Sequence, residues 1–353
     1  MTHRFIASMG VLAVIAAVAS LATIPVAGQA PTNAKAAAAK PWTLHRTSWG
    51  QPDLQGTWAN NGATPLERPK VLAGRQFLTD AEVVALKEVA TKLLGDDAGD
   101  AAFGDDVFEA ALSKTKYQAK DGVGNYNHFW LVDREWDNRT SLITDPPDGR
   151  VPPLTPEAQK KQAARDDYRR LHPADGPEDL PLSQRCITRG LPSIQAGYNS
   201  YYQIFQTPGY VVIHMEMMHD ARIIPLDSRP HLPQNIGQWL GDSRGHWEGD
   251  SLVVETANFT DKQEFRQGRL PQGKVVLIER FTRVGPNTLN YEVTMKDPTT
   301  WTKPWTLMIP WKQTQDLIYE FACHEGNEAM PGALSGYRAK ERAAEEGVRK
   351  GSR

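Results

Sequence analysis

The residues best suited to acid–base chemistry lie close together in the middle of the sequence. A histidine next to carboxylates and an arginine is a combination that enzymes use for proton transfer near neutral pH. The candidate catalytic residues are His214, Glu216, His219, Asp220 and Arg222, with His324 as a sixth from later in the chain. No other stretch of the sequence is as dense in such groups.

A pair of strands must position these residues. The alternation of apolar residues over Tyr210–Met217 predicts a strand with one apolar face, and Arg222–Leu226 predicts its partner. A connecting loop of about three residues would place Glu216 opposite Arg222, an opposite-charge pair that favours this register. His214 would then lie on the same face as both.

This mixed face has two interpretations. In one, Glu216 and Arg222 form an ordinary ion pair at the surface and His214 is an exposed neighbour. In the other, the face points into a ligand cavity, where His214 and Glu216 exchange a proton and Arg222 keeps Glu216 ionised. The first interpretation gains if the opposite, apolar face of the strand lines the interior.

The later part of the sequence predicts antiparallel strands joined by tight turns. The further predicted strands and hairpins are Tyr201–Gln206, Gly245–Phe259, Lys274–Val284, Thr288–Lys296, Trp301–Lys312 and Leu317–Cys323. A turn at Gly285–Asn287 sets Phe281 opposite Tyr291 and Arg280 opposite Glu292, two favourable pairs in one register. We therefore expect a mainly β protein, an antiparallel barrel-like meander with a few peripheral helices.

The predicted helices fall within an insertion over about residues 75–172. They are Phe77–Leu94 with a capping box of Thr79 and Glu82, Val107–Lys114, and Glu157–Leu171 with Thr155 as its cap. We expect one barrel-like domain over residues 42–337 that carries this insertion on its outside, and a charged tail over residues 338–353.

The first thirty residues predict export. His3 and Arg4 precede an apolar run from Ile6 to Val26, which is followed by small residues, the pattern of a signal peptide over residues 1–30. Residues 31–41 form an Ala-rich linker. We expect the mature protein to be periplasmic or secreted, without membrane attachment after signal cleavage.

Cys186 and Cys323 are the two cysteines of the sequence. Export into an oxidising compartment favours a disulfide between them, and two buried thiols are the alternative. A bridge would hold His324 beside a fixed neighbour, which suits a catalytic group.

The charge balance argues against nucleic acid as a partner. The formal charge is −2, and removing residues 1–30 takes away Arg4 and no acid, which leaves −3. Phosphate binding needs a positive patch that this composition does not supply. No phosphate loop, dinucleotide fingerprint, His-Glu-x-x-His or Gly-x-Ser-x-Gly motif is present. We expect no cofactor; a metal at His214 and Glu216 would need another ligand, such as His231 or His324.

Two resemblances to known families add to this interpretation. Gly56-Thr57-Trp58 resembles the start of the lipocalin-like (calycin) barrels, which implies that Trp58 plugs the closed end of a barrel. Three longer motifs resemble a large family of exported bacterial proteins to which no reaction is assigned. They are PDLQGTW at Pro52–Trp58, DPPDGRVPPLTPE at Asp145–Glu157 and WLGDSRGHWEGDSLVVET at Trp239–Thr256.

Two functions follow as expectations. In the first, the protein is a cofactor-independent exported enzyme, a lyase, isomerase or hydrolase that acts on a small cyclic or aromatic molecule in a barrel cavity. In the second, it is a lipocalin-like binding protein for a small apolar ligand. Acid and base groups that converge in a cavity would favour the enzyme, whereas apolar walls would favour the binding protein.

Overall fold

The computed structural model describes residues 42–94, 100–118, 131, 133–194, 196–262 and 274–351. The predicted signal peptide and linker lie outside the described residues. The chain divides into two units, Met1–Thr43 and Leu44–Arg353. Everything below concerns the second unit.

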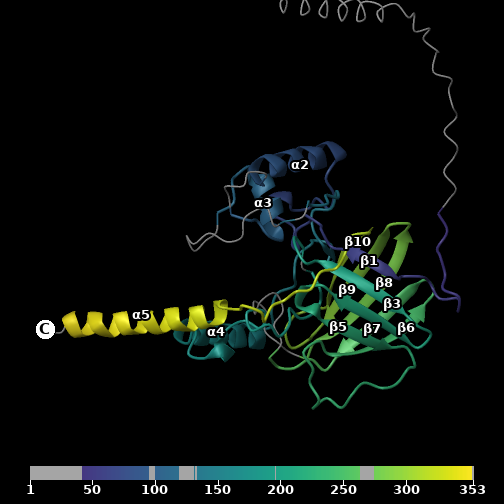
Figure 1. Cartoon of the computed structure of the whole chain (residues 1–353). Coiled ribbons are helices and arrows are strands. Elements are labelled where there is room, and N and C mark those ends of the chain that lie inside the picture. The colour runs from purple at the N-terminus through teal and green to yellow at the C-terminus, as the bar shows by residue number, and fades with distance from the viewer. Residues whose placement is uncertain are drawn as a thin grey trace, which may run out of the picture. The chain divides into compact units, whose positions relative to one another are not determined.

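An antiparallel sheet of ten strands forms the body of this unit (Figure 1). The strands are β1 (Gly56–Ala59), β2 (Ile143–Asp145), β3 (Tyr201–Gln206), β4 (Tyr210–Met215), β5 (Ala221–Pro225), β6 (Asp242–Glu248), β7 (Ser251–Ala257), β8 (Val276–Gly285), β9 (Thr288–Lys296) and β10 (Trp305–Thr314). Their order is β5-β4-β3-β1-β10-β9-β8-β7-β6, and β2 also pairs with β10. The prediction of a mainly β, antiparallel protein is confirmed.

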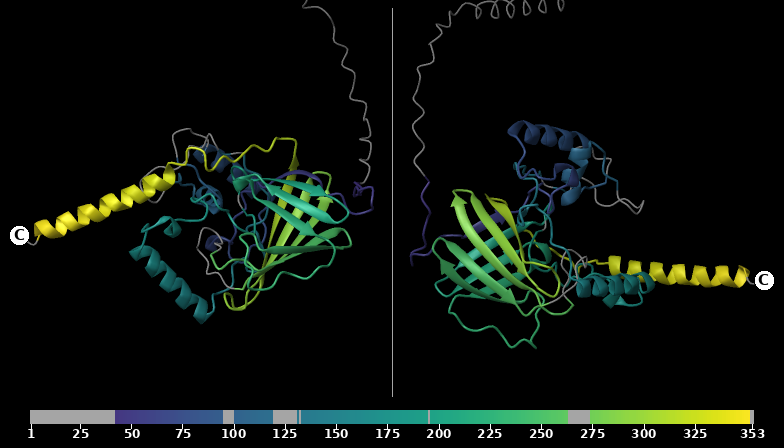
Figure 2. Two further views of the ribbon diagram at one scale, coloured as in Figure 1. Left: turned by 60° about the horizontal axis from the view of Figure 1, so that its bottom comes forward. Right: turned by 180° about the vertical axis from the view of Figure 1, so that it is seen from behind.

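The sheet curls strongly (Figure 2) but is not closed into a barrel, so the barrel-like expectation is confirmed only in part. Among the described residues, β5 and β6 at the two ends of the order form no backbone ladder. Their side chains nevertheless meet, since a Cβ on Gly245 would lie 2.8 Å from both Ile224 and Leu226. Contact across this seam therefore depends on side chains.

The hairpin of β8 and β9 has the predicted register. Phe281 lies opposite Tyr291 and Arg280 lies opposite Glu292. The rings of Phe281 and Tyr291 stack with their centroids 4.9 Å apart inside the curled sheet. A tight turn and two favourable cross-strand pairs were enough to fix this hairpin.

Large rings fill the interior of the curled sheet. The largest fully buried side chains there include Trp58, Trp305, Trp311, Tyr291 and Phe281. Tyr202 stacks on Trp311 at 4.2 Å between centroids. Aromatic packing of this kind stabilises a core through its large buried area.

Trp58 lies at the end of the sheet near the β8–β9 turn. Its indole Nε1 donates to the Leu54 carbonyl at 2.9 Å, and the Arg283 guanidinium covers its ring at 5.4 Å. Gln206 closes the same end by accepting from the Leu54 N–H at 2.6 Å. The sequence Asp53–Trp58 thus anchors one end of the core.

The predicted register of β4 and β5 is wrong. Ile213, not Glu216, lies opposite Arg222. The reason is local: the chain leaves the strand at Glu216 and makes a 3-10 turn over Met217–His219, in which Met218 takes a φ of 62°. A non-glycine residue in this left-handed region is uncommon, and nothing in its sequence signals it.

Four helices accompany the sheet: α2 (Asp80–Leu94), α3 (Asp105–Ser113), α4 (Pro156–Leu171) and α5 (Ala329–Gly351). The capping box of α2 is confirmed, because the Thr79 N–H donates to Glu82 at 2.8 Å and the Glu82 N–H donates to Thr79 at 3.3 Å. The Thr155 hydroxyl caps α4 by accepting from the Ala158 N–H at 3.1 Å. None of the helices in the described part of the chain is long and apolar enough to span a bilayer.

The end of the chain differs from expectation. Leu317–Cys323 is not a strand, and β10 is the last one described. This segment lies against the Met217–His219 turn instead, where the Tyr319 N–H donates to Glu216 at 3.2 Å. We expected the domain to end at residue 337 and a charged tail to follow it. Instead, one helix, α5, runs across this position.

Candidate functional site

The structure separates the six predicted catalytic residues. Arg222 points into the sheet interior, where it forms a bidentate ion pair with Glu279 at 2.9 and 2.5 Å. Tyr291 donates to the same carboxylate at 2.7 Å, and Thr256 donates at 3.0 Å. Arg222 also donates to Ser243 at 3.1 Å. All five side chains are buried, so Arg222 serves a closed polar network.

Electrostatics inside this network keep each group in its hydrogen-bonding form. Burial, together with the Glu279 carboxylate, raises the pKa of Tyr291 well above its ordinary value. Burial is the largest single influence on the pKa of Arg222 and lowers it, but the charge of Glu279 and its hydrogen bonds, with a smaller contribution from Tyr291, together raise this pKa above its ordinary value. The tyrosine therefore stays a hydroxyl donor and the arginine stays charged.

Glu216 and His219 lie on the 3-10 turn. Glu216 is buried, and only one of its oxygens is hydrogen-bonded, to the Tyr319 N–H; within the described chain Oε2 has no partner. His219 is exposed and its Nδ1 lies 3.0 Å from the Phe321 carbonyl. His214 is half-buried on β4 opposite Gln203. The same-face pair of His214 and Glu216 that we predicted does not form, since Glu216 has left the strand.

The face of β4 that lines the interior is the apolar one. Val211, Ile213 and Met215 are buried in the main core. An inward apolar face, together with His214 and Glu216 exposed to solvent, was the arrangement expected to count against a catalytic cavity there; the apolar face does line the interior, whereas Glu216 is buried and His214 is half-buried.

The predicted disulfide is confirmed as a pair, with the Sγ atoms of Cys186 and Cys323 2.01 Å apart. It joins the segment before β3 to the segment after β10, beside the 3-10 turn. His324, directly after Cys323, is exposed, so the bridge does not bring it into an enclosed site.

Asp220 is a predicted site residue whose pKa is changed by its surroundings. It lies at the end of the 3-10 turn, where its Oδ2 accepts from the Thr188 hydroxyl at 2.7 Å. Burial raises the pKa of Asp220 to about 6. Its carboxylate is therefore a weaker acid than an ordinary aspartate.

This shift predicts a pH-dependent stability. Because the folded-state pKa of Asp220 is about 6 and an unfolded aspartate titrates at about 3.9, folding favours the protonated form. The Asp220 contribution should fall as pH rises from about 4 to about 6, by roughly 2 kcal/mol after allowance for solvent screening. Urea unfolding of wild type and Asp220→Asn across this range should show that the variant gains stability relative to wild type at the higher pH. A constant difference between the two proteins would contradict the assignment.

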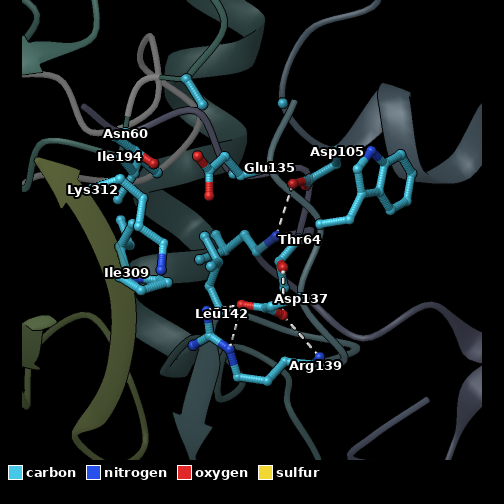
Figure 3. Close-up of a pocket in the computed structure, with 16 residues that line it drawn as sticks. Asn60, Thr64, Asp105, Glu135, Asp137, Arg139, Leu142, Ile194, Ile309 and Lys312 are labelled. Atoms are coloured by element: carbon cyan, nitrogen blue, oxygen red, sulfur yellow. Dashed lines mark hydrogen bonds and ion pairs between the residues drawn. The ribbon is translucent and has the colours of Figure 1, made fainter. Parts of the chain in front are cut away.

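A pocket that the sequence did not predict lies beside β10 (Figure 3). Its volume is about 160 Å³. The edge of β10 pairs with β1 near Lys312 and with β2 near Thr306, and Pro310, which has no N–H, lies between the two partners. The gap between β1 and β2 leaves room for the pocket.

Most charged groups of the pocket wall have structural partners. Asp105 accepts from the Leu66 N–H at 2.8 Å. Asp137 accepts from Arg139 at 2.9 and 2.6 Å and from the Thr64 hydroxyl at 3.0 Å. Arg139 also donates to the Met308 carbonyl at 2.8 Å. These bonds hold the wall to the backbone of the sheet.

Glu135 differs from these groups. Its backbone is fixed, since its N–H donates to Asn61 at 2.9 Å and its carbonyl accepts from Ala63 at 2.8 Å. In the part of the chain that the structure describes, no hydrogen bond or ion pair involves its carboxylate, which Figure 3 shows directed toward the side formed by Asn60 and Lys312. Lys312 donates to Thr288 at 3.1 Å. The backbone of Glu135 is therefore fixed, and its exposed side chain has acceptor oxygens available.

Sequence reasoning missed this pocket because its residues come from segments far apart in the chain. They lie after β1, at the start of α3, between residues 135 and 142, at Ile194 and Ala196, and on β10. The one available signal was the run Asp133–Arg139, in which acidic and basic residues flank a tryptophan outside any predicted element.

No group of three or more His, Cys, Asp or Glu side chains among the described residues is placed to hold a metal ion. The expectation that the protein uses no cofactor remains a prediction.

Comparison of the chain with protein-family models, with curated proteins and with solved structures finds no match. The resemblance to a family of exported bacterial proteins therefore stays a prediction based on the motifs.

Proposed function

We propose that the protein is an exported binding protein for a small, partly apolar molecule, which it holds in the pocket beside β10. The observation that carries this proposal is Glu135, a carboxylate with a fixed backbone that faces a pocket and has no structural partner among the described residues. Pockets with apolar walls and a few polar groups are the usual sites of small-molecule binding.

The pocket suggests the kind of ligand. A volume of about 160 Å³ is near that of an apolar cavity that accepts a single benzene ring. Leu66, Trp136, Leu142 and Ile194 supply apolar walls. A hydroxyl or amine on the ligand would donate to Glu135, which fixes its orientation.

The proposed ligand site is not the interior of the curled sheet. Aromatic packing between Trp58, Tyr202 and Trp311 argues against an interior ligand of the lipocalin kind. We also propose that the likeness to calycin barrels reflects common ancestry. In that case the sheet is an opened barrel in which Gly56-Thr57-Trp58 still places a buried tryptophan at one end.

Export supports the same function. A disulfide between Cys186 and Cys323 persists in oxidising compartments, in line with the predicted signal peptide. We propose a periplasmic or secreted location, where the protein would meet small molecules from outside the cell.

A second candidate function rests on Glu135 itself. A carboxylate that faces a partly apolar pocket is also a suitable general acid or base. In that case the protein is a cofactor-independent lyase, isomerase or hydrolase acting on a ring-sized substrate.

Blocking the pocket should abolish binding. A Cβ on Gly62 meets only Asn60, at 3.9 Å, so Gly62→Leu can place its side chain in the pocket without a backbone clash. We expect wild type to bind members of a set of single-ring probes that includes benzyl alcohol, benzylamine and cyclohexanol, in saturation-transfer NMR, and Gly62→Leu to lose these signals. Gly209→Leu, in the β3–β4 turn where a Cβ meets nothing within 4 Å, is the matched control.

Two results would count against the pocket. One is unchanged binding by Gly62→Leu, and the other is equal loss in Gly209→Leu. Glu135→Gln separates the two functions for any probe that binds: an enzyme would lose turnover by about 10²-fold or more with little change in Kd, whereas a binding protein would lose affinity alone.

A further inference from the structure

The terminal nitrogens of Arg134 are buried without a counter-charge in the described part of the chain. Its side chain is partly exposed, but both terminal nitrogens, Nη1 and Nη2, are buried, and among the described residues neither has a hydrogen-bond partner. Burial of the guanidinium lowers the pKa of Arg134 to about 10. An unpaired buried charge is costly, and a long, flexible side chain would ordinarily turn toward water.

Nearby acids do not neutralise Arg134. Asp133 and Glu135 flank it in the sequence, yet both are exposed, and neither Nη1 nor Nη2 of Arg134 is bonded to them in the described chain.

Gly197 makes room for this guanidinium. A Cβ at position 197 would lie 2.5 Å from Nη2, 2.8 Å from Nη1 and 3.0 Å from Cζ of Arg134. The φ of +119° at Gly197 also favours glycine. The three atoms nearest to a Cβ at this position all belong to the Arg134 guanidinium, so a side chain at position 197 would displace it.

A second arginine contacts the next residue along. Arg189 donates from Nη2 to the Tyr198 hydroxyl at 3.3 Å, and its Nε is buried without a partner in the described chain. One guanidinium therefore contacts Gly197 and another contacts the hydroxyl of the next residue, Tyr198, and three of their buried nitrogens have no acceptor in the described chain.

We propose that Arg134, beside Gly197, is the centre of a binding site for a small oxyanion, such as a carboxylate or a phosphate group. The planar fork of a guanidinium matches two oxygens of either group, and such charge-assisted bonds would satisfy donors that have no acceptor within the described chain. This site is distinct from the Glu135 pocket, because its donors are the unpartnered arginine nitrogens. Anion binding at Arg134 does not depend on what the pocket binds.

The test is the thermal stability of three proteins in sodium acetate and in sodium phosphate, with ionic strength held constant by sodium chloride. Wild type and Arg342→Met, which removes an exposed arginine charge on α5, should show a Tm that starts to rise near the Kd of the anion and then increases by roughly 2–4 °C for each tenfold increase of anion. Arg134→Met should show only the small rise, proportional to salt concentration, that excluded salts cause. The anion whose logarithmic rise starts at the lower concentration distinguishes a carboxylate site from a phosphate site.

A direct measurement on the wild-type protein covers the case in which Arg134→Met does not fold. The Arg134 Nε–H resonance of ¹⁵N-labelled protein should shift in a saturable way with acetate or phosphate, while that of Arg342 should not. The proposal is overturned if Arg134→Met keeps the logarithmic rise in Tm of wild type, or if the Arg134 resonance does not respond to either anion.

Discussion

Glu279→Ala should lower the free energy of unfolding by about 3–5 kcal/mol, because it leaves the buried Arg222 guanidinium without its partner. The pair is fully enclosed, with side-chain exposures of 4% for Arg222 and 0% for Glu279. Tyr291 and Thr256 would each lose an acceptor as well. Urea unfolding at neutral pH measures this loss directly.

Two comparisons make the experiment decisive. Glu248→Ala removes an acid of β6 that pairs with Arg280 of β8 at 2.8 Å on the exposed side of the sheet, and it should cost less than about 1 kcal/mol. Replacing both charges, as in Arg222→Met with Glu279→Leu, should restore much of the stability, because apolar side chains of similar volume need no counter-charge. A cost for Glu279→Ala no larger than that for Glu248→Ala would show that the pair does not stabilise the core.

Reduction of the Cys186–Cys323 disulfide should be the other large perturbation. The bridge closes a loop with a sequence separation of 137. In the chain-entropy model, a crosslink of this span stabilises the folded state by about 5 kcal/mol. Denaturant unfolding with and without dithiothreitol should therefore give a clearly lower midpoint for the reduced wild-type protein.

The matched control is Cys186→Ala with Cys323→Ala, which should unfold at the reduced midpoint and should not respond to dithiothreitol. Mass spectrometry of an unreduced digest should show the linked peptides. Equal midpoints for oxidised and reduced wild type would mean that the bridge does not restrict the unfolded chain.

Features specified by neighbouring residues could be predicted from the sequence. The β8–β9 register followed from Gly285-Pro286-Asn287 and two cross-strand pairs, and the α2 cap followed from the spacing of Thr79 and Glu82. The disulfide followed from two cysteines and a predicted export signal. In each case the feature depends either on residues close together in the sequence or on the compartment in which the protein is expected to fold.

The candidate sites could not be predicted in this way. The β4–β5 register depends on a positive φ at Met218, and a methionine in the sequence does not indicate such a conformation. The partner of Arg222, Glu279, lies 57 residues away, and the Glu135 pocket needs five separate segments to come together. Local patterns carry no information on which distant side chains share an interior.

The absence of a backbone ladder between β5 and β6 within the described chain has a consequence for association between molecules. Unpaired strand edges are templates on which other chains can add strands and aggregate. Here Arg222 of β5 reaches across the seam to Ser243 of β6, Thr256 of β7 and Glu279 of β8, in addition to the apolar contact of Ile224 and Leu226 at Gly245. Loss of this guanidinium would weaken the contact between the two edges, and we expect such a variant to associate more readily than wild type.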